Sequence, residues 1–179
     1  WNRGQATPEP EQTKGKRVLL QEPGVVALKE DRLMLWCRTD AGSQYVAYSQ
    51  DQGKTWTKPK PSNIISPVSP ATIERIPSTG NLLLVWNDHR DIPATLRGKR
   101  TPLCAAVSTD EGQTWKHLKI LENNPNGWYC YTAMAFIEDH VLLAYCAGDR
   151  RMTNGLALTQ ITRFPVKWID NKPEPAPSR

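Results

Sequence analysis

The sequence predicts an all-β chain built from β-propeller blades of four antiparallel strands. Apolar residues come in runs of about four to seven, rich in Val, Leu, Tyr and Trp, with turn residues between them. No window shows a sustained helical period. The octet SQDQGKTW at residues 49–56 returns as STDEGQTW at residues 108–115, beginning 59 residues later. A unit of roughly 40 to 60 residues that holds about four strands is typical of a propeller blade.

Each blade is predicted to start with a hairpin that leads into a further strand. The hairpins span residues 25–38, 71–88 and 131–148, and the strands that follow them lie within residues 44–56, 101–115 and 155–169. The first two of these strands end in the octet, whereas the third keeps only a tryptophan. The blades are expected to occupy residues 18–169. Residues 1–17 and 170–179, rich in Pro, Lys, Glu and Gln, are expected to form a polar N-terminal segment or linker and a Pro-rich C-terminal tail.

The octet is predicted to lock the turn at the end of a blade's third strand. In such a turn the Asp carboxylate accepts backbone hydrogen bonds, Gly supplies a positive φ, and Trp packs beneath. The residues concerned are Ser49, Asp51, Gly53 and Trp56 in the first octet and Ser108, Asp110, Gly112 and Trp115 in the second. A calcium loop needs more than one carboxylate. We therefore interpret the octets as structural and expect no metal site.

The composition favours one domain without a membrane span. A chain of 179 residues buries roughly 70% of its unfolded surface, and 39% hydrophobic with 23% charged residues is ordinary for a globular domain. The net charge of +5 is spread along the chain. We expect no nucleic-acid partner, whereas an anionic small molecule would suit such a surface. The cysteines, interpreted as buried thiols because they lack metal-ligand spacing, are Cys37, Cys104, Cys130 and Cys146.

The octet S-x-D-x-G-x-T-W resembles the Asp box of the sialidase (neuraminidase) superfamily, whose catalytic domain is a six-bladed β-propeller. The resemblance covers residues 22–169 and implies about three blades, with the remaining blades N-terminal to this chain. Non-catalytic propellers also carry Asp boxes, so the octets alone leave open a module that binds glycan or protein. The compartment is not written in the sequence, and the family resemblance favours a secreted, periplasmic or otherwise exported protein.

Three spacings of the family's active site are matched. The family places a glutamate at the opening of an inner strand and an arginine about 16 residues later, and Glu22 and Arg38 have that separation. A further family arginine precedes an Asp-box serine by eight residues, as Arg100 precedes Ser108. The family's tyrosine opens an inner strand in a Y-[ST]-x-[LM] context, which YTAM provides for Tyr131.

The resemblance implies retaining hydrolysis of a terminal sialic acid or a related acidic sugar, without a cofactor. Arg38 and Arg100 would hold the substrate's carboxylate, since a guanidinium binds a carboxylate in a bidentate fork. Tyr131 would be the nucleophile and Glu22 its base, because a neutral phenol is not repelled by the anionic substrate. Asp88 and His89, in the loop after the second hairpin, would contact the sugar's glycerol or N-acyl group, unless they form an ordinary polar loop.

Other features depart from the family. The third arginine and the general-acid aspartate belong to the first blades, so this chain by itself is expected to be inactive. Arg75 lies too close to a hairpin turn to match the family's Arg-Ile-Pro motif and is predicted to face solvent. Tyr129, two residues before Tyr131 and thus on the same side of a straight strand, is the alternative nucleophile. Cys146 stands where many sialidases have a glutamate, for which Asp149 is the candidate substitute.

Overall fold

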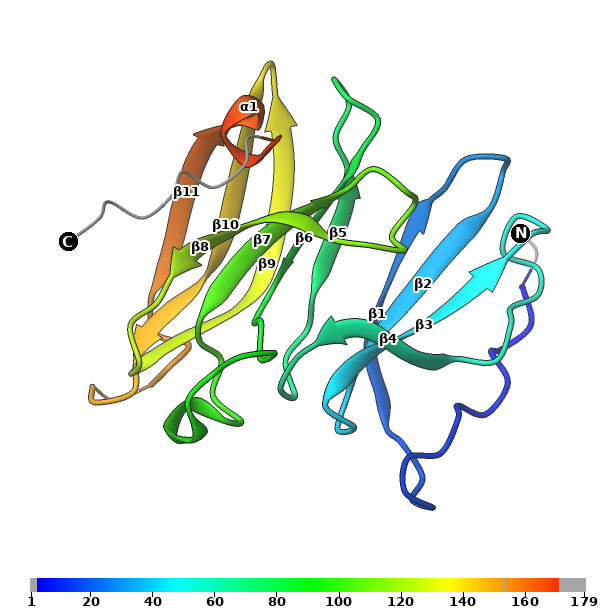
Figure 1. Cartoon of the computed structure of the whole chain (residues 1–179), viewed down its shortest axis with the longest axis horizontal. Coiled ribbons are helices and arrows are strands. Elements are labelled where there is room, and N and C mark those ends of the chain that lie inside the picture. The colour runs from blue at the N-terminus through cyan, green and yellow to red at the C-terminus, as the bar shows by residue number, and fades with distance from the viewer. Residues whose placement is uncertain (1–2, 153, 171–179) are drawn as a thin grey trace.

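A computed structural model describes residues 3–152 and 154–170 and contains three antiparallel sheets that lie side by side in chain order (Figure 1). Blade 1 contains β1 (Leu20–Ala27), β2 (Leu33–Thr39), β3 (Ser43–Ser49) and β4 (Lys60–Ile65). Blade 2 contains β5 (Thr72–Arg75), β6 (Leu82–Trp86), β7 (Leu103–Ser108) and β8 (Lys116–Glu122). Blade 3 contains β9 (Gly127–Ile137), β10 (His140–Asp149) and β11 (Thr159–Pro165).

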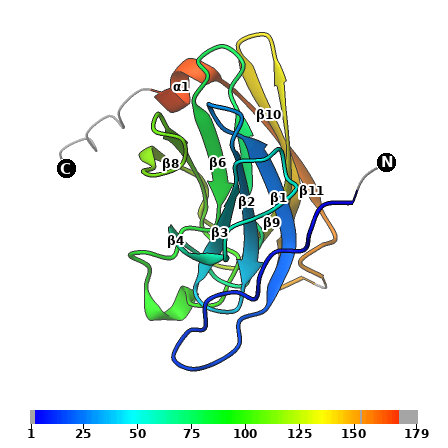
Figure 2. The same ribbon diagram turned by 90° about the vertical axis from the view of Figure 1, so that its right-hand side faces the viewer.

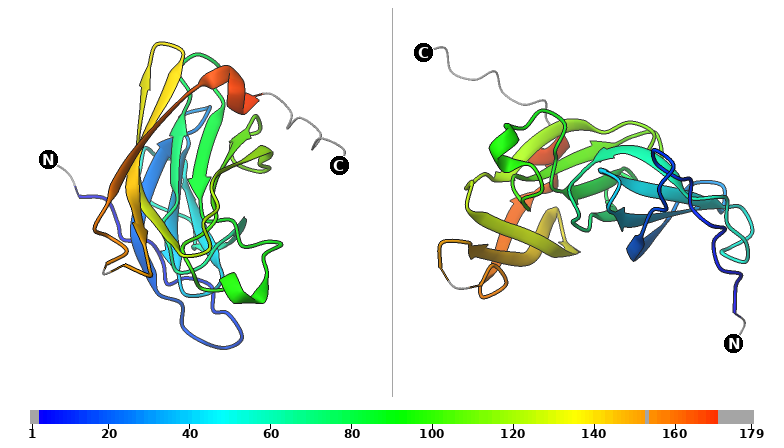
Figure 3. Two further views of the ribbon diagram at one scale, coloured as in Figure 1. Left: turned by 90° about the vertical axis from the view of Figure 1, so that its left-hand side faces the viewer. Right: turned by 90° about the horizontal axis from the view of Figure 1, so that it is seen from below.

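The topology is that of propeller blades. In every sheet the strands that pair are consecutive in the chain. The first strands of the sheets are neighbours, because β5 contacts both β1 and β9, so these three strands form the inner edge of the assembly. Figures 2 and 3 show the same sheets from the two sides and from below, packed face to face. The predicted all-β propeller class is confirmed, with two four-stranded blades and one three-stranded blade.

Blade 3 ends in a short helix where the sequence suggested a decayed octet. The helix α1 (Val166–Asp170) follows β11 directly. Val166 and Ile169 lie one helical turn apart and are both buried, and α1 contacts β7 and β8 of blade 2. The face of the helix that carries this pair packs in the apolar cluster shared by blades 2 and 3. No helix of the described chain has the length and apolar character needed to cross a membrane.

Blade 2 forms the centre of the core because both faces of its sheet are buried. Along β6, Leu82 and Leu84 pack in a cluster shared with blade 1, whereas Leu83 and Val85 pack in a cluster shared with blade 3. Every residue of β6 and β7 is buried. In β2 and β10, by contrast, buried residues alternate mostly with half-buried ones. Within the described residues, blades 1 and 3 therefore each have one face covered and one face open.

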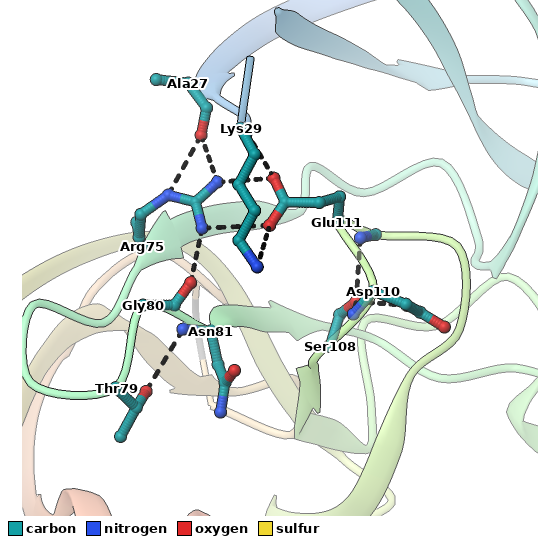
Figure 4. A network of polar contacts seen from close by, with 10 residues as sticks. Ala27, Lys29, Arg75, Thr79, Gly80, Asn81, Ser108, Asp110 and Glu111 are labelled. Carbon is teal, nitrogen blue, oxygen red and sulfur yellow. Dashed lines mark hydrogen bonds and ion pairs between the residues drawn. The ribbon is translucent and has the colours of Figure 1, made fainter. Parts of the chain in front are cut away.

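Arg75 ties blade 2 to blade 1, so the prediction that it faces solvent is wrong. Its Nη2 donates to the carbonyl oxygen of Ala27 at 2.6 Å and lies 2.9 Å from Oε2 of Glu111 (Figure 4). Its Nη1 donates to the carbonyl oxygen of Gly80, and the backbone N–H of Lys29 donates to Glu111 at 2.8 Å. The side chain of Arg75 is only 28% exposed. Glu111 belongs to the second octet, so a variable position of that motif holds the adjacent blade.

The N-terminal segment lies along blade 1. The backbone N–H of Gln5 donates to the carbonyl oxygen of Lys54 at 2.9 Å, next to the first octet's turn. The hydroxyl of Thr13 lies 2.5 Å from the hydroxyl of Tyr45, which is buried in β3. These contacts attach the polar segment to the outer part of blade 1. The predicted C-terminal tail, apart from Asp170 at the end of α1, lies outside the described residues.

Candidate active site

Glu22 and Tyr131 lie at matching irregularities in the inner strands of blades 1 and 3. The register of β1 against β2 shifts between Gln21 and Gly24, and the register of β9 against β10 shifts just where Tyr131 lies. Both residues have a positive φ, 49° for Glu22 and 57° for Tyr131. A β-bulge re-aims a side chain, and strained non-glycine residues cluster at functional sites. The two predicted catalytic residues thus occupy equivalent backbone positions in two blades.

Both bulges lie at the same end of the inner edge. At the other end, Arg75 closes β5 and bonds to Ala27, which closes β1, so these strands run in the same direction. At the starting end, the hydroxyl of Thr72 donates to the carbonyl oxygen of Thr132 at 2.6 Å, which places the first residue of β5 beside the bulge of β9. Inner strands of a propeller surround its central channel. The bulges therefore open toward one mouth of that channel.

Arg38 and Glu22 are in direct contact. Nη1 of Arg38 lies 3.1 Å from Oε2 of Glu22, and Nη2 donates to Oε1 of Gln21 at 2.6 Å. The arginine side chain is 12% exposed and the glutamate side chain 34%. Nε of Arg38 is buried and has no hydrogen-bond partner among the described residues. The predicted base is thus anchored by the predicted clamp arginine, with its carboxylate still partly open to solvent.

Arg100 and Tyr131 also lie together. The guanidinium carbon of Arg100 is 5.1 Å from the ring centre of Tyr131 and 5.0 Å from that of Trp128. The backbone N–H of Tyr129 donates to the carbonyl oxygen of Arg100 at 2.9 Å, which fastens the loop before β7 to β9. Burial alone would lower the pKa of Arg100, but polar contacts with Tyr131 and Cys130 raise it above its ordinary value. A charged guanidinium therefore stands beside a phenol that is 46% exposed.

The prediction that Tyr129 and Tyr131 share one side of the strand is wrong. Tyr129 is 5% exposed and packs edge to face on Tyr145, with the ring centres 6.4 Å apart. Burial raises the pKa of the Tyr129 phenol. Strict alternation assumed a straight strand, whereas the positive φ at Tyr131 turns the chain there. Of the two tyrosines, only Tyr131 is accessible.

Asp88 is occupied within its own loop. Its carboxylate accepts hydrogen bonds from Nη2 and Nε of Arg90, at 2.7 and 3.0 Å. Asp88 and Arg90 line a hollow on the blade's outer side together with Trp115 and His117, among others, and its lining includes neither Arg100 nor Tyr131. The structure thus places Asp88 apart from these two residues.

His89 points to the loop that carries Arg100. Its Nε2 lies 3.2 Å from the carbonyl oxygen of Thr101, the residue after Arg100, and its backbone N–H donates to the carbonyl oxygen of Ile65 at 3.3 Å. Burial lowers the pKa of His89. A neutral imidazole at this position can donate a hydrogen bond to the Arg100 loop, while the backbone of His89 is held by blade 1.

Asp149, the candidate substitute for the family's glutamate, is bound by an arginine of its own loop. The carboxylate of Asp149 accepts a hydrogen bond from Nη2 of Arg151 at 2.6 Å, and this contact lowers the pKa of Asp149. Cys146 pairs with Cys130 across β9 and β10, as Arg38 pairs with Gln21 across β1 and β2. Cys146 thus occupies in blade 3 the position that an arginine has in blade 1.

The two octets form the same hydrogen-bonded turn, as predicted. In the first, Asp51 accepts hydrogen bonds from the backbone N–H of Thr55 at 2.9 Å and from its hydroxyl, and Gly53 has a φ of 84°. The structure adds a role for Ser49, whose Oγ accepts from the N–H of Gly53 and donates to Asp51. The second octet repeats every one of these bonds through Ser108, Asp110, Gly112 and Thr114. In both octets the tryptophan ring lies next to the glycine, since a Cβ atom added to Gly53 or Gly112 would be 3.8 Å from Cζ2 of Trp56 or 3.7 Å from Cζ2 of Trp115.

The octets lie far from the candidate active site. Ser49 pairs with Leu33, which is five residues from Arg38 along β2 and therefore roughly 17 Å away. Among the residues that the structure describes, no group of three or more His, Cys, Asp or Glu side chains is placed to hold a metal ion. The octets thus have a structural role in the turns of the blades.

Sequence reasoning missed Trp128 and Arg150. Trp128 lies under Arg100, and the guanidinium carbon of Arg150 is 4.2 Å from the centre of the same ring. The only signal for Trp128 was its place three residues before Tyr131. Nothing in the sequence distinguished Arg150 from its neighbour Arg151, because their different partners follow from the path of the loop after β10.

Comparisons with known proteins agree with this architecture. A search of curated proteins gives no match. The intramolecular trans-sialidase of Ruminococcus gnavus superposes with a TM-score of 0.66 at 18% identity, over 93% of this chain and 36% of that one. The NanB sialidase of Streptococcus pneumoniae superposes with a TM-score of 0.61 at 19% identity, over 79% of this chain and 22% of that one. An α-L-arabinanase of Penicillium chrysogenum superposes with a TM-score of 0.53 at 18% identity, over 80% of this chain and 44% of that one.

The structural matches show a shared fold and a shorter chain. At 18–19% identity the superpositions show the shared fold alone, and the present chain spans about a third or less of the two sialidases. In sequence, residues 1–143 match the family described as BNR repeat-like domain. The predicted resemblance to the sialidase superfamily, with its BNR or Asp-box repeats, is confirmed by these findings. The chain belongs to the BNR repeat-like domain family.

Proposed function

We propose that this chain supplies three blades of an exo-α-sialidase-type glycoside hydrolase, in which further blades N-terminal to it complete the propeller. The observation that carries the proposal is the placement of Tyr131, an accessible phenol at a bulge of an inner strand with the guanidinium of Arg100 against its ring. The ion pair of Arg38 and Glu22 at the equivalent bulge of blade 1 supports it. The proposed ligand is a sialylated glycan or a related acidic sugar.

In the proposed mechanism, Arg38 and Arg100 bind the carboxylate of the terminal sugar. The Oη atom of Tyr131 attacks the anomeric carbon while the carboxylate of Glu22 accepts the phenol's proton. An acid from another blade protonates the leaving oxygen as the glycosidic C–O bond breaks, and a glycosyl–tyrosine bond forms. Water then displaces the tyrosine oxygen, which recovers its proton. Two displacements at the same carbon retain its configuration.

The loop after β6 would complete the pocket. His89 is adjacent to the Arg100 loop and is the better placed of the two predicted sugar contacts. Asp88, whose carboxylate is bound by Arg90, would contact the sugar only after exchange of that partner. We therefore propose His89 as the contact to test first.

The decisive experiment is hydrolysis of fluorogenic acidic glycosides by the complete protein and by Tyr131→Phe. Loss of the nucleophile is expected to reduce kcat/KM at least about 100-fold, whereas Tyr129→Phe, the matched control, should stay near wild type. Full activity of Tyr131→Phe, with loss in Tyr129→Phe, would move the nucleophile to the buried tyrosine. That result would overturn the assignment.

The rival function is a non-catalytic propeller that binds glycan or protein. It is favoured if the complete protein binds an acidic glycoside without releasing the aglycone, and if Tyr131→Phe binds as well as wild type. Turnover of a different acidic sugar, with no turnover of sialosides, would keep the enzyme class and change the substrate. The glycoside panel thus separates the three readings.

A further inference from the structure

The indole of Trp128 carries two arginines from two different blades. Arg100 precedes β7 in blade 2, and Arg150 follows β10 in blade 3. Their guanidinium carbons lie 5.0 and 4.2 Å from the centre of the Trp128 ring. The backbone N–H of Arg150 donates to the carbonyl oxygen of Asn126 at 2.8 Å, so the base of this side chain is fixed to the segment before β9. Two guanidinium groups thus contact one indole ring, and one of them also contacts Tyr131.

Neither arginine has a carboxylate partner among the described residues. Arg38, Arg90 and Arg151 differ in this respect, because each lies within 3.1 Å of an acidic oxygen. Asp149, the acid adjacent to Arg150 in the chain, is committed to Arg151. Burial and the positive charge of Arg100 lower the pKa of Arg150. Two like charges are therefore held near each other without compensation by the protein.

Arg100 also makes polar contacts with Tyr131 and Cys130, whereas the N–H donors of Arg150 have no carboxylate partner among the described residues. A guanidinium that lies over an aromatic ring uses its face for the cation–π contact, whereas its N–H donors point outward in the guanidinium plane. An anion between or beside the two guanidinium groups would reduce their mutual repulsion and accept hydrogen bonds from their N–H groups. A packing role alone would not require two unpaired charges on one ring, since an aliphatic chain would cover the indole as well.

We infer that Arg150 is a further anion-binding residue of this site, acting with Arg100 on the carboxylate of an acidic sugar. The identity of the sugar rests on the proposed function. The presence of an anion-binding pair of arginines on Trp128 does not depend on the proposed function. Arg150 thereby supplies from blade 3 a guanidinium for the carboxylate in addition to Arg38 and Arg100.

The pair is tested by quenching of tryptophan fluorescence with iodide, an anion, and acrylamide, a neutral quencher. The chain has seven tryptophans, so the difference between wild type and Trp128→Phe isolates the share of Trp128. In wild type, iodide should quench the fluorescence of Trp128 more strongly than expected from the accessibility that acrylamide quenching measures. Arg150→Gln should reduce the iodide effect at least about twofold, because the local anion concentration falls with the charge. Arg150→Lys should restore part of it.

Arg151→Gln is the matched control, since it removes a neighbouring arginine whose charge is already paired. Its iodide quenching should equal that of wild type. Unchanged acrylamide quenching in Arg150→Gln shows that the exposure of Trp128 is preserved. An iodide effect in Arg150→Gln equal to wild type would overturn the inference.

Protection by N-acetylneuraminic acid separates this inference from the proposed function. In the complete protein, the sugar should shield Trp128 from iodide, with a Kd about tenfold or more weaker in Arg150→Gln, whereas the neutral sugar N-acetylmannosamine should not shield it. Equal Kd values in wild type and Arg150→Gln would refute a role for Arg150 and leave the proposed function standing. No shielding, with the iodide effect of Arg150 intact, would refute the sialic-acid ligand and leave the anion-binding pair standing.

Discussion

Asp51 and Asp110 are the central acceptors of the two octets. The threonine hydroxyl four residues later makes the largest contribution, with the threonine N–H and the serine hydroxyl, to lowering the pKa of each carboxyl to about 2. An aspartate in an unfolded chain has a pKa of about 3.9. Because the pKa is lower in the folded state, each carboxylate adds stability that is fully present above pH about 4 and is lost as the pH falls through about 2.

The variant Asp51→Asn/Asp110→Asn is expected to lose this pH-dependent stability. Its Tm at pH 7 should fall by about 3 °C or more, and its Tm should decline less than that of wild type between pH 4 and pH 2. Thermal unfolding followed by circular dichroism at several pH values measures both effects. Asp31→Asn, in the turn between β1 and β2, is the control and should follow wild type. An acid-induced decline as steep as that of wild type would show that the octet carboxylates do not contribute.

At the scale of the strand, the bulge of β1 is coupled to the packing between blades. Gly24 follows the bulge, and a Cβ atom added there would lie 2.1 Å from Cζ2 of Trp36. That indole is buried, and its Nε1 donates to the carbonyl oxygen of Ala71 in the next blade at 2.9 Å. The ring cannot retreat without loss of this bond. The backbone that presents Glu22 therefore depends on a glycine two residues away.

Gly24→Ala is expected to destabilise the chain by about 1–3 kcal/mol, because the added methyl group overpacks the indole. Unfolding in urea measures the loss. In a Trp36→Phe background the same substitution should cost less, since the smaller ring leaves room for the methyl group. Strictly additive effects of the two substitutions would show that the contact does not limit this position.

At the scale of the whole molecule, blades 1 and 2 are joined by a charged contact as well as by their apolar cluster. Arg75 bonds to Ala27, Gly80 and Glu111 at once (Figure 4). Burial alone would raise the pKa of Glu111, but the hydrogen bonds from Arg75 and Lys29 lower it. The first octet has Gln52 at the equivalent position, with a similar φ of 61° against 59°. Glutamine is therefore compatible with this turn.

Glu111→Gln should weaken the junction between the blades without disturbing the octet. The expected loss is about 1–3 kcal/mol of unfolding free energy, because the partly buried guanidinium of Arg75 loses its counter-charge. Arg17→Gln, which breaks a pair whose side chains are more than 70% exposed, should cost less than about 1 kcal/mol. Urea midpoints of the two variants make the comparison. Equal losses would show that the contact is no more than a surface pair.

The features that sequence predicted well are local ones. The octet specifies its own turn, and hairpins follow from apolar runs and turn residues, so the blades and their hairpins were predictable. The side of the strand on which Tyr131 lies was not, because alternation holds only where the register is unbroken. Nor was the partner of Arg75, since Glu111 lies 36 residues away in the chain. The stacking of Arg150 on Trp128 likewise depends on how two blades meet.

The matching bulges also bear on how such a chain arises. Glu22 in blade 1 and Tyr131 in blade 3 stand at one backbone position of a duplicated unit, and the position opposite carries Arg38 in one copy and Cys146 in the other. Duplication copies the strained backbone together with its orientation toward the channel. Single substitutions can then place a carboxylate in one copy and a phenol in another. A repeat of this kind thus keeps one bulge geometry in two blades while the side chain at the bulge differs.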